Sequence, residues 1–115
     1  MSEEQSRAHV ERFNAAVRSG DWPSFVTGFA PDAVMSFEGP PVGPYVGIDA
    51  IAEAYATSPP TDTMEVVAVH PADDADVVRF RWSSGGTGSM TIVRRPDGRI
   101  RHLGVIFDPE IDVPL

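Results

Sequence analysis

The chain is organised around one stretch, Phe37-Glu38-Gly39-Pro40-Pro41-Val42-Gly43-Pro44-Tyr45-Val46-Gly47. An apolar segment leads into it, and a helical pattern of apolar residues leads out of it. Its three prolines fix φ and its three glycines permit positive φ, which predicts a rigid loop with a defined path. Glu38 is the one carboxylate set into this apolar run. It is either a catalytic base at the mouth of a pocket or a solvated acid at the end of a strand.

The segments around this loop predict mainly helices before it and strands after it. Three helices are predicted, up to residue 19, over 21–29 and over 47–57. Five strands are predicted, over 33–38, 64–70, 77–83, 87–94 and 99–108. This order predicts a single α+β domain over residues 1–115. We expect its helices to cover one face of a curved antiparallel sheet and to leave a cone-shaped apolar pocket.

The composition excludes several classes of function. The 115 residues include 17 acidic and nine basic side chains, which gives a formal net charge of −8 at pH 7. Such a chain repels the phosphates of nucleic acids and an anionic membrane surface. It has no cysteine for disulfide or thiolate chemistry, and its first residues do not resemble a signal peptide. We expect a cytoplasmic protein without a cofactor that binds neither nucleic acid nor membrane.

The polar residues do not predict a metal site. His9, His70 and His102 fall on different predicted elements, and no two of them have the spacing of metal ligands. We expect His9 to be an exposed helical residue, although its position four residues before Phe13 would also let it point into the cone. The acidic run Asp73-Asp74-Ala75-Asp76 lacks the spacing and the closing glutamate of a calcium loop, so it is expected to be a solvated turn.

Several motifs resemble the NTF2-like superfamily, in particular its SnoaL-like and ketosteroid-isomerase-like branch. In chain order they are Val10-Glu11-Arg12-Phe13-Asn14-Ala15-Ala16-Val17 with Gly20-Asp21-Trp22, Phe29-Ala30-Pro31-Asp32-Ala33-Val34, Gly47-Ile48-Asp49-Ala50-Ile51 with Tyr55, and Pro96-Asp97-Gly98-Arg99-Ile100. The resemblance covers nearly the whole chain and implies the same cone of helices and curved sheet. It implies no single activity, because this fold carries isomerases, cyclases, hydrolases, dehydratases and non-enzymes.

The resemblance implies a catalytic base on the first strand. Ketosteroid isomerases use an aspartate there, with a tyrosine and a protonated aspartate as the oxyanion hole. Counting back from Gly47 places the base at Glu38, whereas counting forward from Asp32 places it at Phe37. Neighbours on a strand face opposite sides, so only one of these two residues can face the pocket. We predict Glu38, with a bulge at Glu38-Gly39 that absorbs the extra residue.

The oxyanion hole of ketosteroid isomerases has no counterpart in this chain. The tyrosine of the first helix corresponds to Phe13, and the second donor corresponds to Met90 or Thr91. Losing even one oxyanion donor typically costs about 10²–10³ in rate, which argues against true ketosteroid isomerisation. Tyr55 matches a helix tyrosine that supports the missing one, and we predict that it donates to an oxygen of the ligand.

The sequence therefore predicts a pocket for a small hydrophobic molecule in a ketosteroid-isomerase-like or cyclase-like enzyme. The predicted catalytic residues are Glu38 and Tyr55. The predicted contacts with the substrate are Phe13, Tyr45, Trp82, Met90, Val105 and Phe107, with Tyr45 as a lid over the mouth. The alternative is a non-catalytic ligand-binding or dimerisation module of the same fold.

Two further hypotheses concern the late strands. Arg79 and Arg81, with Asp108 or Glu110, would imitate the Asp-Arg-Asp set of related epoxide hydrolases. The strand over 99–108 turns His102, Gly104 and Ile106 to the face opposite the pocket. By analogy with the family, that face is the expected homodimer surface.

Overall fold

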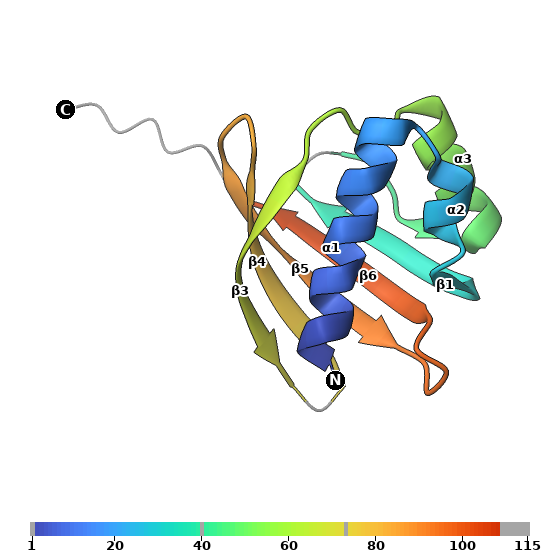
Figure 1. Ribbon diagram of the computed structural model, residues 1–115. Helices are drawn as coiled ribbons and strands as arrows, with labels where there is room; N and C mark the ends of the chain where they lie inside the picture. Colours follow the sequence, from blue (N-terminus) through green and yellow to red (C-terminus); the bar gives the residue numbers. More distant parts are fainter. Residues whose placement is uncertain (1, 40, 73, 109–115) are drawn as a thin grey trace.

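The described part of the chain folds into three helices and one sheet. The computed structural model describes residues 2–39, 41–72 and 74–108. The helices are α1 (Ser2–Ser19), α2 (Trp22–Val26) and α3 (Ile48–Thr57). The strands are β1 (Phe29–Glu38), β2 (Tyr45–Val46), β3 (Met64–Pro71), β4 (Asp76–Trp82), β5 (Thr87–Arg94) and β6 (Ile100–Phe107). The helices lie over one face of the curved sheet (Figure 1), which confirms the predicted α+β architecture.

The sheet is mixed, and the prediction of a wholly antiparallel sheet is wrong at one position. Its strand order is β2-β1-β6-β5-β4-β3. The first long strand, β1, pairs in parallel with the last, β6, whereas every other neighbouring pair is antiparallel. A parallel pair needs a long crossover connection. Here the whole segment from β2 to β5 provides that connection.

The boundary between α2 and β1 also differs from the prediction. The helix begins after Asp21, whose carboxylate accepts a hydrogen bond from the Ser24 amide at 3.3 Å, but it ends at Val26 rather than at residue 29. Phe29 already pairs with Ile100 on β6, and the register shifts before pairing resumes at Val34. This irregular start accommodates Pro31, which has no amide proton to donate to the ladder.

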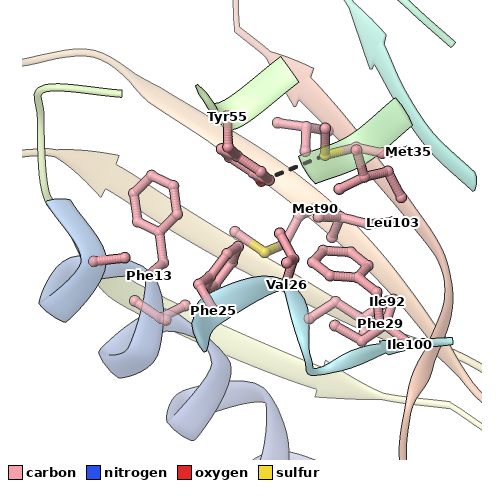
Figure 2. Packing of buried hydrophobic residues seen from close by; sticks show 14 of the residues in the cluster. Phe13, Phe25, Val26, Phe29, Met35, Tyr55, Met90, Ile92, Ile100 and Leu103 are labelled. Carbon is pink, nitrogen blue, oxygen red and sulfur yellow. Dashed lines mark hydrogen bonds between the residues drawn. The ribbon is translucent and has the colours of Figure 1, made fainter. Parts of the chain in front are cut away.

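The hydrophobic core lies between the helices and the inner face of the sheet (Figure 2). On α1 the buried stripe is Val10, Phe13 and Ala16. Alternate positions of the strands supply the opposing surface, with Ala33 and Met35 from β1, Val78 and Phe80 from β4, Met90 and Ile92 from β5, and Leu103 and Val105 from β6. This period of two fixes which residues of each strand can reach a space under the helices.

A buried polar cluster lies below α1 and corrects the prediction of a solvated acidic turn. Asp76 is only 3% exposed, because it is the first residue of β4 and faces inward. Its Oδ2 accepts a hydrogen bond from the Ser6 hydroxyl at 2.7 Å and lies 3.5 Å from Nη1 of Arg94. A buried carboxylate needs such partners, since taking an isolated charge out of water is costly.

None of the described helices lies on the other face of the sheet (Figure 1). His102, Gly104 and Ile106 lie on it, as their alternation predicts, and His102 Nε2 lies 3.3 Å from the Ser36 hydroxyl of the neighbouring strand. The homodimer expected through this face stays a prediction. No described helix is long and apolar enough to cross a membrane.

Candidate ligand cavity

A cavity of about 410 Å³ lies under α1 and α3, against the inner face of the sheet. Most of its wall is apolar. It is lined by His9, Phe13, Phe37, Tyr55, Pro60, Thr61, Asp62, Met64, Trp82, Ser84, Gly85, Met90, Leu103, Val105 and Phe107. Three of these side chains carry the polar chemistry that matters most: the imidazole of His9, the hydroxyl of Tyr55 and the carboxylate of Asp62.

Aromatic rings form a continuous wall along one side of the cavity. Phe107 stacks on Trp82, with ring centroids 6.0 Å apart, and on Phe37 at 6.2 Å. Trp82 on β4 and Phe107 on β6 meet across β5, where Gly88 pairs with Phe107. A Cβ at Gly88 would lie 2.6 Å from the Ile106 carbonyl oxygen and 2.7 Å from Phe80 Cζ, so no larger residue fits. A ligand in the cavity would therefore lie against ring faces.

Tyr55 is held by packing and keeps a weakly engaged hydroxyl. Its ring stacks on Trp22, with centroids 4.7 Å apart and an angle of 2° between the planes. Its hydroxyl donates to Sδ of Met35 at 3.4 Å (Figure 2). A thioether is a poor acceptor. Burial raises the pKa of Tyr55, so the hydroxyl keeps its proton at any physiological pH.

His9 is a functional candidate that was not among the predicted site residues. The prediction of an exposed histidine is wrong, since His9 is 3% exposed and lines the cavity. Its ring contacts Phe25, with centroids 5.3 Å apart, and Phe29 at 6.3 Å. Burial, together with the nearby guanidiniums of Arg12 and Arg94, lowers its pKa to about 3. The imidazole is therefore neutral at physiological pH.

Two loops supply the rest of the polar lining. Pro60, Thr61 and Asp62 belong to the segment between α3 and β3, and Ser84 and Gly85 belong to the turn between β4 and β5. Asp62 joins the loops, because its Oδ2 accepts hydrogen bonds from both the amide of Ser84, at 3.1 Å, and the Ser84 hydroxyl. Both of those bonds use Oδ2, which leaves Oδ1 for another donor.

Comparison with known proteins places this architecture in a family. A family model described as a SnoaL-like domain matches residues 10–103, which is most of the chain. This chain belongs to the SnoaL-like family. No curated protein matches it.

Solved structures show the same NTF2-like fold. A proposed polyketide cyclase from Sinorhizobium meliloti has 24% identity and a TM-score of 0.68, with 85% of this chain and 93% of that chain covered. A proposed isomerase from Bacillus subtilis has 21% identity, a TM-score of 0.75 and coverage of 95% and 90%. A SnoaL-like protein of unknown function from Burkholderia thailandensis has 16% identity, a TM-score of 0.72 and coverage of 95% and 99%. At these identities the likeness shows the fold alone.

Most of the predicted contact residues of this SnoaL-like domain do line the cavity. They are Phe13, Trp82, Met90, Val105 and Phe107, and Tyr55 joins them. Tyr45 does not, so its prediction as a lid is wrong. It pairs with Met35 at the edge of the sheet and packs edge-on against Phe37, with centroids 6.2 Å apart. None of the described residues of the loop from Gly39 to Val46 lines the cavity.

The prediction that Glu38 faces the pocket is also wrong. Ala33 and Met35 are buried on the inner face of β1, and strand alternation then turns Phe37 inward and Glu38 outward. Phe37 lines the cavity, whereas Glu38 is exposed and does not. The ladder between β1 and β6 runs without a register shift from Val34 to Glu38, so no bulge there reverses the side-chain directions.

The arginine set proposed for epoxide hydrolysis lies outside the cavity. Nη2 of Arg79 donates to Oδ2 of Asp108 at 2.8 Å, and the Thr87 hydroxyl donates to the same oxygen at 2.7 Å. Arg79 alternates with the buried Val78 and Phe80, so this ion pair lies on the uncovered face of the sheet. Glu110 lies outside the described residues. The cavity therefore receives no guanidinium from this set.

Proposed function

We propose that this SnoaL-like domain binds a small, mainly apolar molecule in the cavity between the helices and the sheet. The observation that carries the proposal is the cavity itself, about 410 Å³ in volume with a wall of aromatic and aliphatic side chains. Ligand pockets typically measure about 300–1,000 Å³ and combine apolar walls with a few polar groups. Each Å² of apolar ligand surface buried there contributes about 25 cal/mol to binding before the costs of association.

Tyr55 supplies a hydrogen bond for an oxygen of that molecule. Its hydroxyl donates to the Met35 thioether at 3.4 Å, and a carbonyl or hydroxyl oxygen of a ligand is a better acceptor than sulfur. The stacking of the Tyr55 ring on Trp22 fixes the position from which the hydroxyl reaches such an oxygen. A ligand with a carbonyl group is therefore favoured over a pure hydrocarbon.

We expect Tyr55→Phe to weaken the binding of 2-acetylnaphthalene by about fivefold to tenfold, since a net hydrogen bond is worth about 1 kcal/mol. Isothermal titration calorimetry would measure the two dissociation constants. Tyr45→Phe removes the same atom from the tyrosine outside the cavity and should leave the affinity unchanged. Equal affinity in the wild type and Tyr55→Phe would refute the role of the hydroxyl.

A second candidate function is proton transfer within the ligand, as in an isomerase-like or cyclase-like enzyme. Asp62 favours it, because it is the only carboxylate that lines the cavity within the described residues and its Oδ1 is left for a donor. In this reaction Asp62 takes a proton from the carbon beside the carbonyl and returns it to another carbon of the same molecule. Tyr55 donates to the enolate oxygen between the two transfers. Atoms balance without a co-reactant.

Turnover of β,γ-unsaturated ketones tests the enzyme directly, because the conjugated product is followed by its ultraviolet absorbance. We expect Asp62→Asn to lower kcat by about 10² or more, the usual contribution of a positioned base. Glu38→Gln removes the same charge from the outer face and should not change kcat. If no ketone of the panel turns over while 2-acetylnaphthalene still binds, the domain is a non-catalytic binding module.

A further inference from the structure

We infer that His9 binds a hydrogen-bonding group of the ligand, so that the cavity selects uncharged apolar molecules with a hydroxyl or carbonyl on the side facing α1. This inference rests on the proposed function and specifies the chemical class of its ligand. It adds a second polar contact to the one that Tyr55 offers.

The surroundings of His9 leave its ring without a protein partner. It is 3% exposed, lies beside Phe25 and Phe29, and borders the cavity. Within the described residues, no hydrogen bond joins either ring nitrogen of His9 to the protein. Neither nitrogen is fully enclosed by protein atoms, because the one fully enclosed side-chain nitrogen or oxygen without a partner is Nη2 of Arg94. The nitrogens of His9 are therefore open to the cavity.

A ligand group is the partner that this arrangement lacks. Burying a polar group without a hydrogen bond destabilises a folded chain, and a hydrogen bond to that group removes the penalty. His9 lies on the same stripe of α1 as Phe13, which also lines the cavity. A molecule that lies against Phe13 can therefore reach the imidazole with one end.

The charges around His9 decide which group it accepts. Arg12 on the same helix and Arg94 on β5 disfavour its protonation, as does burial, and its pKa falls to about 3. A neutral imidazole offers one N–H donor and one nitrogen acceptor, which suit a hydroxyl or a carbonyl. An ammonium group would lie near the two guanidiniums, and a charged group of either sign would leave water for a mainly apolar wall, so an uncharged group is favoured at this end of the cavity.

Matched probes test the inference. 2-Naphthol and 2-methylnaphthalene have the same body and differ by a hydroxyl in place of a methyl group. We expect His9→Leu to lower the affinity for 2-naphthol relative to 2-methylnaphthalene by about tenfold, measured as the rise in Tm that each probe causes. His9→Gln keeps a donor and an acceptor and should keep most of the preference. His70→Leu, at an exposed histidine, should change neither affinity.

The same variants distinguish the possible failures. We expect His9→Leu without a probe to fold and to melt within a few degrees of the wild type, because leucine replaces a ring that makes no hydrogen bond within the described residues. A large fall in its Tm, or failure to fold, would show that His9 is structural and would overturn the inference. An unchanged ratio of the two affinities would overturn it while leaving the proposed function in place. If neither probe binds the wild type, the proposed function fails and the inference fails with it.

Discussion

The free energy of unfolding of this domain is expected to fall steadily as the pH drops from about 6.5 towards 3, and His9 is the main cause in the upper half of that range. The folded pKa of His9 is about 3, whereas its ordinary value is 6.5. Within this window the unfolded chain binds a proton that the folded chain does not. Stability is therefore complete above pH 6.5 and is lost as the pH falls, by up to about 1.4 kcal/mol for each pH unit.

The groups around His9 support a loss of stability as the pH falls. Burial disfavours the imidazolium, and Arg12 and Arg94 repel it. The carboxylate of Asp76 already lies 3.5 Å from Arg94 and accepts from Ser6, so it is engaged elsewhere. Other acid-sensitive groups act at lower pH. The pKa of Asp97 is lowered by hydrogen bonds from Arg99, and the pKa of Asp108 by hydrogen bonds from Arg79 and Thr87.

Urea unfolding at half-unit steps between pH 7 and pH 5 would measure this dependence. His9→Leu should abolish most of the slope in this interval, since leucine binds no proton in either state. His70→Leu should retain it, because that histidine is exposed. If His9→Leu shows the same slope as the wild type, or if the His9 ring titrates near pH 6.5 by NMR, the account of its burial is wrong.

Local sequence patterns predicted most of the helices and strands, but they could not predict which distant segments pair in the sheet. Apolar stripes with period 3.6 placed α1 and α3, and alternation placed the inward faces of β4 and β6. The parallel pairing of β1 with β6 was not predictable in this way, because it depends on contact between residues such as Val34 and His102, which are 68 positions apart in the sequence. The end of α2 was misplaced because Phe29 is equally apolar as a helical or a strand residue.

Glu38 was wrongly predicted to face the pocket because its position was counted back from Gly47 across the loop, and the alternation of side chains along β1 was given less weight. Met35 and Phe37 are two large apolar residues two positions apart, and this spacing already indicated that Phe37 shares the inward face. The alignment from Gly47 assigned the extra residue to a bulge that β1 does not have. The alternation of apolar residues along β1 was the better predictor of which side chain faces the cavity.

The polar residues that line the cavity could not be predicted equally well from the sequence. His9 lies four residues before Phe13 on the stripe of α1, so its inward position was available as an alternative. The position of Asp62 could not be predicted, because it lies in a segment without apolar periodicity. It is held beside the cavity by its hydrogen bonds with Ser84, 22 residues further along the chain. Such a contact between two loops appears only once the strands are paired.

Filling the cavity is the second change with a large expected effect. Val105 is 8% exposed and lines the cavity from β6, so Val105→Trp places an indole in the space that the ligand needs. Overpacking of this kind costs roughly 1–3 kcal/mol of stability, which a domain of ordinary stability tolerates. Displacing one buried apolar group of the ligand costs about 1.5–3 kcal/mol of binding, or roughly tenfold to a hundredfold in affinity.

The next residue provides the matched control. Ile106 is 40% exposed on the opposite face of the same strand, so Ile106→Trp adds the same ring outside the cavity. Circular dichroism and thermal unfolding would establish that both variants are folded before binding is compared. The two substitutions then differ only in the face of the sheet that receives the indole.

The most direct test of the cavity as a ligand site is the dissociation constant of 2-naphthol for the wild type, Val105→Trp and Ile106→Trp, measured by calorimetry. We expect the wild type and Ile106→Trp to bind with equal affinity and Val105→Trp to bind at least about tenfold more weakly. Equal binding by all three proteins, or a loss confined to Ile106→Trp, would contradict the account and place the ligand outside the cavity.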